Sequence, residues 1–233
     1  MRLMHPCLAE PICFTENQIP VLVSENPVLF RSMVRDLCAQ AEGGCGAFVL
    51  SRNYEVLDCA RVLEVVVDHL HPGASSKKLS AKLTTALKRF AQQELQLETT
   101  EALEKLYGYI AMLCERFDHP LTFSQEMDMA PILKACGVRL DLEDGELGEN
   151  LLDYLTACQA LCAVECFVLV DLKAYLSAQE LDLFYQAVQY RKLNVLVLES
   201  HTSVVWHPCE QVRLLDEDLC ELALEKTEGR RYD

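Results

Sequence analysis

Asp171 closes the apolar run FVLVD at positions 167–171, and a strand that ends in an aspartate is how nucleotide hydrolases present a carboxylate to magnesium. Such an enzyme also needs a phosphate loop, G-x-x-x-x-G-K-[ST], whose backbone amides and lysine hold the phosphates. The sequence contains no such loop, and its one glycine cluster, GGCG at 43–46, lies between an expected helix and an expected strand, the reverse of the required order. We therefore interpret Asp171 as a strand-end residue that caps a turn. A nucleotide hydrolase with a degenerate phosphate loop is the alternative.

Cysteine and histidine residues are the next candidates for chemistry. Cys158, Cys162 and Cys166 are spaced four apart, and the first two would share one face of a helix. Thiolate metal sites more often use a pair of C-x-x-C units, so core packing is the favoured interpretation. The histidines are scattered along the chain, and no Ser-His-Asp or Cys-His set follows from their order. His201 and His207 are expected on a loop after the last strand.

Residues 74–93 hold five basic side chains and no acidic one, within an expected helix. These are Lys77, Lys78, Lys82, Lys88 and Arg89. At about 100° per residue they fall within an arc of about 140°, and apolar side chains fill the opposite side. An ordinary solvated face usually mixes charges of both signs, so this face favours phosphate binding. A membrane-surface helix is less favoured, because Phe90 is the single aromatic residue here.

The net charge of the chain is −15, which taken alone argues against a nucleic-acid partner. Residues 71–137, however, hold eight basic and eight acidic side chains. This segment is therefore neutral, and the rest of the chain carries the whole negative charge. The cationic helix lies in the neutral segment.

An acidic passage follows the helical stretch and contains Asp118, Glu126 and Asp128. Carboxylate oxygens are the ligands that Ca²⁺ prefers, at about 2.3–2.6 Å. No EF-hand loop is present. The passage predicts either a calcium site or a solvated acidic loop.

The elements that must position these residues alternate between strand and helix at both ends of the chain. Strands are expected at 19–25, 61–70, 138–143, 166–171 and 194–200, and helices at 26–42, 147–163 and 177–192, with a helical pattern from about 74 to 136. Asn26 and Ser76 are expected helix caps, and TTEALE at 99–104 is the expected start of a second helix in the middle stretch. The alternation predicts an α/β fold with a mostly parallel sheet. We place the domain boundaries at 1–70 and 138–233 for a head, with a helical leg at 71–137 inserted in it.

The composition limits the class of protein. Half of the residues are hydrophobic, so the chain is globular, and no apolar window is long enough to span a membrane. The 12 cysteines lie mostly inside apolar runs, as small hydrophobes do in a reducing cytosol. We expect a location in the bacterial cytoplasm.

Several stretches resemble one known family. They are PVLVSENPVLFRSMVRDLC near the start, ILKACGVRLD at 132–141 and AYLSAQEL…NVLVLE in the last third. In order and pattern they are similar to the small accessory adaptation protein of type II-A CRISPR systems, over nearly the full length. The motifs are a cadence of strand, helix and strand, and none is a catalytic signature.

The resemblance implies a head that is similar to a nucleotide-hydrolase core without a phosphate loop, and no catalytic activity. It implies a homotetrameric ring, stabilised by calcium, that holds double-stranded DNA, prefers free ends and takes part in acquiring new spacers. The partners that it implies are the integrase complex and the RNA-guided effector nuclease of the same system.

The resemblance implies a role for only a few individual residues. Lys134 in ILKACGV lies where similar proteins have a lysine before the Gly-Val step, so it is an expected DNA contact. Similar proteins have a dense acidic run where this sequence reads LTFSQEMD, with Glu126 and Asp128 remaining and Asp118 nearby. Calcium dependence is therefore expected to be weakened or lost. A calcium-binding scaffold whose basic helix contacts an acidic partner is the second alternative.

Overall fold

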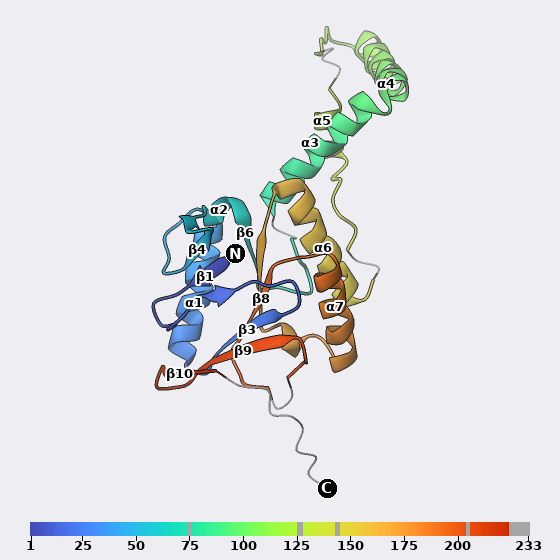
Figure 1. The fold of residues 1–233 in the computed structure, drawn as a ribbon. Helices are drawn as coiled ribbons and strands as arrows, with labels where there is room; N and C mark the ends of the chain where they lie inside the picture. The colour runs from blue at the N-terminus through green and yellow to red at the C-terminus, as the bar shows by residue number, and fades with distance from the viewer. Residues whose placement is uncertain (74–75, 125–127, 143–144, 204–205, 224–233) are drawn as a thin grey trace. The chain divides into compact units, whose positions relative to one another are not determined.

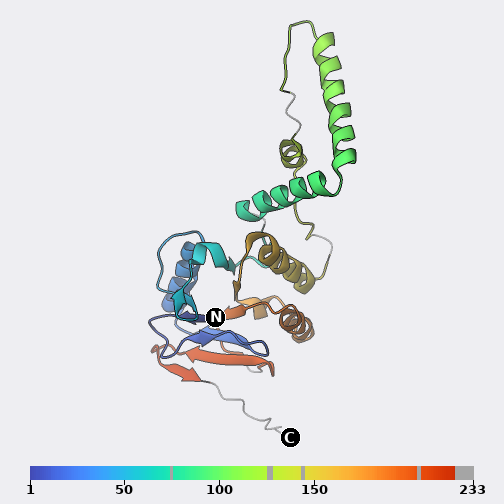
Figure 2. The same ribbon diagram turned by 45° about the horizontal axis from the view of Figure 1, so that its top comes forward.

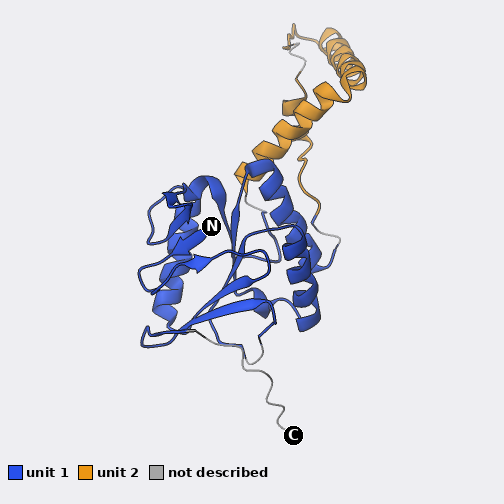
Figure 3. Ribbon diagram, in the orientation of Figure 1, with its two compact units in different colours: residues 1–74, 142–233 blue, residues 75–141 orange. Residues whose placement is uncertain are grey.

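The computed structural model describes residues 1–73, 76–124, 128–142, 145–203 and 206–223. The chain divides into two compact units, residues 1–74 with 142–233 and residues 75–141 (Figure 3). The head and leg boundaries expected from the sequence were 71 and 137, so each lies four residues before the corresponding structural boundary. Among the described residues, none of the helices combines the length and apolar character that a membrane span needs.

The first unit is built around a six-stranded sheet in the order β10-β9-β3-β8-β7-β6. Its strands are β3 (Ile19–Ser24), β6 (Leu63–Val66), β7 (Cys166–Val170), β8 (Val195–Glu199), β9 (Glu210–Leu215) and β10 (Glu221–Ala223). All neighbouring pairs are parallel except β9 and β10, which are antiparallel. The structure thus has the predicted α/β fold with a mostly parallel sheet.

Helices cover both faces of this sheet (Figure 1). They are α1 (Pro27–Ala41), α2 (Cys59–Val62), α6 (Leu147–Cys162) and α7 (Ala178–Tyr190), with a short 3₁₀ helix η1 (Leu172–Ala174) after β7. Every residue of β3, β7 and β8 is buried, because a parallel strand between two helical layers has no solvent face. This explains why these strands read as continuous apolar runs.

Local capping signals fix where two of these helices begin. The Asn26 side chain accepts hydrogen bonds from the backbone N–H groups of Val28 and Leu29, both at 3.0 Å, which confirms the predicted cap of α1. Ser177 and Glu180 form a reciprocal capping box at the start of α7. Both helices therefore begin within a residue or two of the predicted position.

A second, four-stranded antiparallel sheet belongs to the same unit and was not predicted. It has the order β2-β1-β4-β5 and comprises β1 (Arg2–Met4), β2 (Ile12–Cys13), β4 (Val49–Arg52) and β5 (Glu55–Val56). Its buried residues Leu3 and Leu50 join Met33 and Leu37 of α1 in one hydrophobic core. The strands are too short for their alternation to stand out in the sequence.

Three strand predictions need correction. Residues 138–142 form no strand, and residues 143–144 lie outside the described residues. The strand expected at 61–70 is confined to β6, because Asp58 caps the short helix α2 just before it. Strands β9 and β10 follow β8, which was expected to be the last strand.

The second unit is helical. It contains α3 (Lys77–Gln93), α4 (Gln96–Arg116) and α5 (Met129–Ala135), and both α4 and α5 pack against α3 (Figure 2). The Ser76 side chain accepts a hydrogen bond from the Leu79 N–H at 3.2 Å, as predicted for the cap of α3. The predicted start of α4 at Thr99 was wrong: α4 begins at Gln96 without a side-chain cap, and Thr99 Oγ1 donates to the Ala91 carbonyl.

Candidate nucleic-acid interface

The cationic face of α3 is largely open to solvent. Lys77, Lys78, Lys82 and Arg89 are exposed, whereas Leu79 on the opposite side is 5% exposed. Gln, Ser and Thr fill the remaining polar positions, and α3 itself contains no acidic residue. Four of the five predicted DNA contacts on this helix are thus exposed along its length. We refer to Lys77, Lys78, Lys82 and Arg89 as the cationic face.

Lys88, the fifth predicted contact, is held by an acidic partner. Its Nζ lies 3.0 Å from Oδ2 of Asp128, and each side chain is about one third exposed, at 35% and 36%. Asp128 is also the N-cap of α5, and its Oδ1 accepts a hydrogen bond from the Ala130 N–H at 3.0 Å. The structure thus pairs a predicted DNA contact with a predicted calcium ligand 40 residues away.

Lys134 is exposed in the last turn of α5 and contributes to the same electrostatic environment. The pKa of Asp128 is lowered by the Ala130 hydrogen bond first, then by the Lys88 hydrogen bond, with the charges of Lys88 and Lys134 adding to the effect. Asp128 therefore stays ionised near neutral pH. Lys134 lies in the same unit as the cationic face and adds a further positive charge to that unit.

The described residues do not form a calcium site. Both oxygens of Asp128 are already engaged by Ala130 and Lys88, and a cation beside Lys88 would be repelled. Asp118 lines an open cavity of about 550 Å³ at the end of α4, and Glu126 lies outside the described residues. In the part of the chain that the structure describes, no three His, Cys, Asp or Glu residues are grouped as metal ligands. Calcium binding therefore remains a prediction that follows from the family resemblance.

The Lys88–Asp128 pair gives a first testable prediction. Asp128→Asn keeps an oxygen that can cap α5 but removes the charge that neutralises Lys88. We expect DNA affinity to rise roughly three- to tenfold near 0.1 M salt, with the slope of log K against log salt steeper by about 0.9, as for one added phosphate contact. A fluorescence-anisotropy salt titration measures both. Asp118→Asn, which makes the same charge change in the same unit, is the matched control, and equal effects of the two substitutions would contradict the pairing.

Asp171, which could have been a magnesium ligand, links the ends of two neighbouring strands. It has a left-handed backbone conformation, with φ 53° and ψ 40°, directly after β7. Its Oδ1 accepts a hydrogen bond from the Ser200 N–H at 2.7 Å, which ties the end of β7 to the end of β8. The structure confirms the interpretation as a strand-end residue, but the predicted capping of a turn was wrong: the Asp171 side chain makes no capping hydrogen bond to the 3₁₀ helix that follows and binds the Ser200 N–H instead.

A buried charge cluster that was not predicted from the sequence lies close to Asp171. Lys173 Nζ lies 2.8 Å from Glu210 Oε1, with the lysine side chain 12% exposed and the glutamate fully buried. The Tyr185 hydroxyl donates to the same carboxylate at 2.8 Å. Burial raises the pKa of the neighbouring Glu199 to about 7, despite the hydrogen bond that its Oε1 accepts from the Lys173 N–H. These four residues lie on four different elements, η1, β9, α7 and β8, so only folding brings them together.

The three cysteines spaced four apart are core residues. Cys158 is 2%, Cys162 8% and Cys166 0% exposed. Burial raises the pKa of the Cys166 thiol well above its usual range, which keeps it protonated and unreactive. Their burial confirms the prediction of core packing.

An apolar stripe on α4 is the remaining feature of the second unit. Leu106, Tyr109 and Leu113 recur at helical spacing and are 38%, 54% and 50% exposed, and Phe117, the C-cap residue directly after the helix, is 61% exposed. Exposed apolar residues that line up on one helix are typical of a surface that another protein covers.

The chain is similar in sequence to a known protein family and in fold to solved structures. Residues 40–219 match the model of a family described as CRISPR-associated protein (Cas_Csn2). No curated protein is similar enough in sequence to be matched with the chain. One similar solved structure is the dimeric post-hydrolysis state of an ATP-binding cassette bound to ADP and Pi, which has 9% sequence identity and a TM-score of 0.42 over 93% of this chain and 90% of that chain. A likeness of this size carries no conclusion about function.

Proposed function

Because the chain belongs to the Cas_Csn2 family of CRISPR-associated proteins, we propose that it is a non-catalytic ring protein that binds the ends of double-stranded DNA during spacer acquisition. The cationic face of α3 carries this proposal. It presents four exposed basic side chains on a helix without acidic residues, in a protein whose net charge is −15. A face of this kind binds the phosphate backbone and does not read base sequence.

The charge distribution supports binding inside an enclosed channel. The first unit carries most of the acidic side chains, so its surface repels DNA, while the second unit offers Lys77, Lys78, Lys82, Arg89 and Lys134. A DNA molecule held by such a lining slides, because phosphate contacts are the same at every position along the duplex.

Self-association is supported by the apolar stripe on α4. Leu106, Tyr109, Leu113 and Phe117 expose apolar surface that a monomer would leave in water. We propose that copies of the chain cover this stripe in a homotetramer. Four copies multiply the phosphate contacts of one cationic face, which makes binding tight and strongly dependent on salt.

The proposed partners within the CRISPR system are the integrase complex and the RNA-guided effector nuclease. A role without catalysis is supported by the absence of a phosphate loop from the sequence and by Asp171, whose carboxylate accepts a hydrogen bond from the Ser200 N–H. The proposal needs no magnesium and no bound nucleotide.

A comparison of one plasmid in two forms tests the proposal. The closed circle and the linearised form are bound at low and at moderate salt, with and without calcium, and complexes are separated by gel shift. We expect the linear form to bind and the closed circle not to bind, because a ring can be threaded only from an end. Equal binding of both forms would contradict the ring. Absence of binding at low salt would contradict DNA binding and favour a scaffold with an acidic protein partner.

A further inference from the structure

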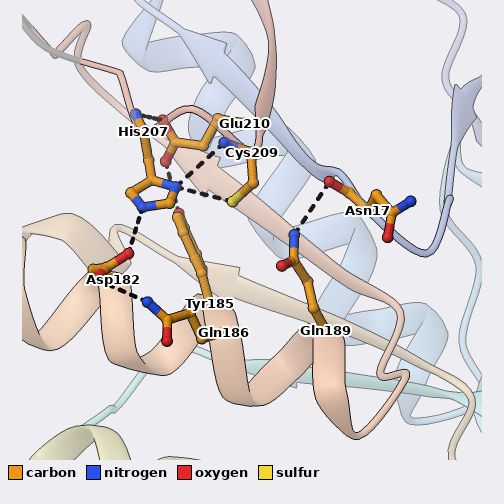
Figure 4. Close-up of polar contacts among 8 residues, drawn as sticks. All are labelled: Asn17, Asp182, Tyr185, Gln186, Gln189, His207, Cys209 and Glu210. Atoms are coloured by element: carbon orange, nitrogen blue, oxygen red, sulfur yellow. Dashed lines mark hydrogen bonds and ion pairs between the residues drawn. The ribbon is translucent and has the colours of Figure 1, made fainter.

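The segment before β9 places a cysteine, a histidine and an aspartate in a row (Figure 4). The Cys209 sulfur lies 3.0 Å from Nδ1 of His207, and Nε2 of the same ring lies 2.9 Å from Oδ1 of Asp182. Asp182 comes from α7, and the other two residues from the turn at 206–209. A nucleophile, a base and a carboxylate that orients the base are the parts that activate a thiol in many unrelated proteins.

The hydrogen bonds around His207 fix which ring nitrogen carries the proton. The Cys209 backbone N–H points at Nδ1, at 3.3 Å, so Nδ1 is an acceptor when the ring is neutral. Nε2 then carries the proton and donates to Asp182. The lone pair of Nδ1 therefore faces the Cys209 thiol and can take its proton, which leaves a thiolate beside an imidazolium ring.

Asp182 is suited to stabilise this ion pair. Its Oδ2 accepts a hydrogen bond from the Gln186 side chain at 2.9 Å, one turn further along α7. The hydrogen bonds from His207 and Gln186 lower the pKa of Asp182, so its carboxylate is ionised wherever the thiol would react. The carboxylate accepts the Nε2–H hydrogen bond and so holds the His207 ring with Nδ1 toward the Cys209 sulfur.

The turn at 206–209 is fixed by hydrogen bonds and packing, including contacts with the buried cluster around Glu210. The His207 N–H donates to Glu210 Oε2 at 2.9 Å, and the His207 ring packs edge-on against Tyr185, with centroids 5.4 Å apart. The Cys209 carbonyl accepts a hydrogen bond from the Ile19 N–H at 2.8 Å. Cys209 itself is partly exposed. The thiol is thus fixed against its base and still accessible from solvent.

We propose that Cys209 is a reactive thiol that is modified by low-molecular-weight disulfides such as glutathione disulfide. The Cys209 thiolate attacks one sulfur of the disulfide, a new S–S bond forms, and the old S–S bond breaks. The released thiolate takes the proton that His207 removed from Cys209. Cys209 is oxidised and the leaving thiol is reduced, so the reaction needs no further reagent.

The adduct would be reported by Trp206, the only tryptophan of the chain, which lies three residues before Cys209. Its ring is packed against Lys173, with Nζ 4.1 Å from the ring centroid. An adduct on Cys209 separates the sulfur from His207 and crowds this turn. We therefore expect the emission of Trp206 to change when Cys209 is modified.

Competition between thiols within one folded chain tests the proposal. The full-length protein is treated with limiting iodoacetamide at pH 7, and the labelling rate of each cysteine is read by peptide mass spectrometry. We expect Cys209 to react at least tenfold faster than the exposed Cys45 and Cys220, because an unperturbed thiol is only a few per cent thiolate at this pH. Equal rates for Cys209 and Cys220 would overturn the proposal.

Two variants distinguish a Cys209 thiol that His207 activates from one that reacts only because it is exposed. His207→Asn keeps an acceptor for the Cys209 N–H but cannot take a proton, and Asp182→Asn removes the carboxylate charge that faces Nε2 of the ring. We expect His207→Asn to bring Cys209 down to the rate of Cys220, and Asp182→Asn to slow it several-fold. The rates of the buried Cys158 and Cys166 in the same digests show whether each variant is folded, because these thiols become accessible only when the chain unfolds. An unchanged Cys209 rate in His207→Asn would contradict the role of the ring.

The pH dependence gives an independent readout. The titratable or charged groups that face His207 and Cys209 are Asp182 and Tyr185 from α7 and Glu210 with its partner Lys173. In the wild type, the Cys209 rate should be nearly flat from pH 6.5 to 8.5, while the rate of Cys220 rises with pH. Glutathione disulfide should then change Trp206 emission in the wild type and not in Cys209→Ser. A first adduct on any other cysteine would contradict the assignment.

Discussion

The triple substitution Lys77→Glu, Lys78→Glu and Lys82→Glu should reduce DNA binding at least about 100-fold near 0.1 M salt. Each lysine is exposed on the first turns of α3, and each reversal removes one phosphate contact and adds a repulsive charge. The slope of log K against log salt should become shallower by about three for each bound copy, at roughly 0.9 per lost contact. Glutamates in the first turn of a helix interact favourably with its dipole, so α3 should stay folded.

A matched control makes the same charge change on the other unit. Arg31 and Arg35 on α1 and Lys192 after α7 are exposed, and their reversal to glutamate also lowers the charge of the chain by six. We expect this control to bind DNA nearly as well as the wild type, since screening within about 10 Å weakens distant charges. If both triple variants lose binding equally, total charge governs the interaction and the cationic face has no special role.

Lys173→Met should be the most destabilising single substitution among the charged residues considered. The change removes the only basic partner seen on the Glu210 carboxylate within the described residues, and that carboxylate is fully buried. Breaking a buried ion pair by removing one partner typically costs about 3–5 kcal/mol, because an uncompensated charge is left behind. Urea unfolding at pH 7, followed by Trp206 emission, measures the loss.

A second substitution distinguishes the uncompensated charge from lost packing. Lys173→Met combined with Glu210→Gln removes both charges and keeps an acceptor for the Tyr185 hydroxyl at the same position. We expect the double variant to recover most of the lost stability. Lys192→Met, at an exposed ion pair with Glu16, should change stability by no more than about 0.5 kcal/mol. A Lys173→Met variant as stable as Lys192→Met would contradict the claim that the buried Lys173–Glu210 pair stabilises the fold.

The stability and thiol predictions concern the same turn but are independent of the DNA-binding proposal. The Trp206–Glu210 turn lies in the first unit, whereas the cationic face and the apolar stripe lie in the second. Loss of DNA binding by the α3 variants would therefore not depend on the state of Cys209. Conversely, a reactive Cys209 would stand even if the closed plasmid bound as well as the linear one.

The sequence by itself determined the elements whose signals are local. Strands β3, β7 and β8 are continuous apolar runs because they are buried on both faces, and α1, α3 and α7 begin at caps whose partners are two or three residues away. The cationic face of α3 is also local, since helical periodicity alone places the four exposed residues on one side. The order and spacing of these strands and helices also indicated the family.

Only the tertiary structure decided which residues meet across long stretches of chain. Lys88 and Asp128 are 40 residues apart, and their pairing turned a predicted DNA contact and a predicted calcium ligand into partners. The small antiparallel sheet and the missing strand at 138–142 depend on whether a neighbouring strand is available, which local pattern does not encode. Asp182 reaches His207 across 25 residues, because α7 packs against the sheet next to the start of β9. The sequence specifies the chemical type of each side chain. The environment that buries it, pairs it with a charge or activates it comes from contacts that form only when the chain folds.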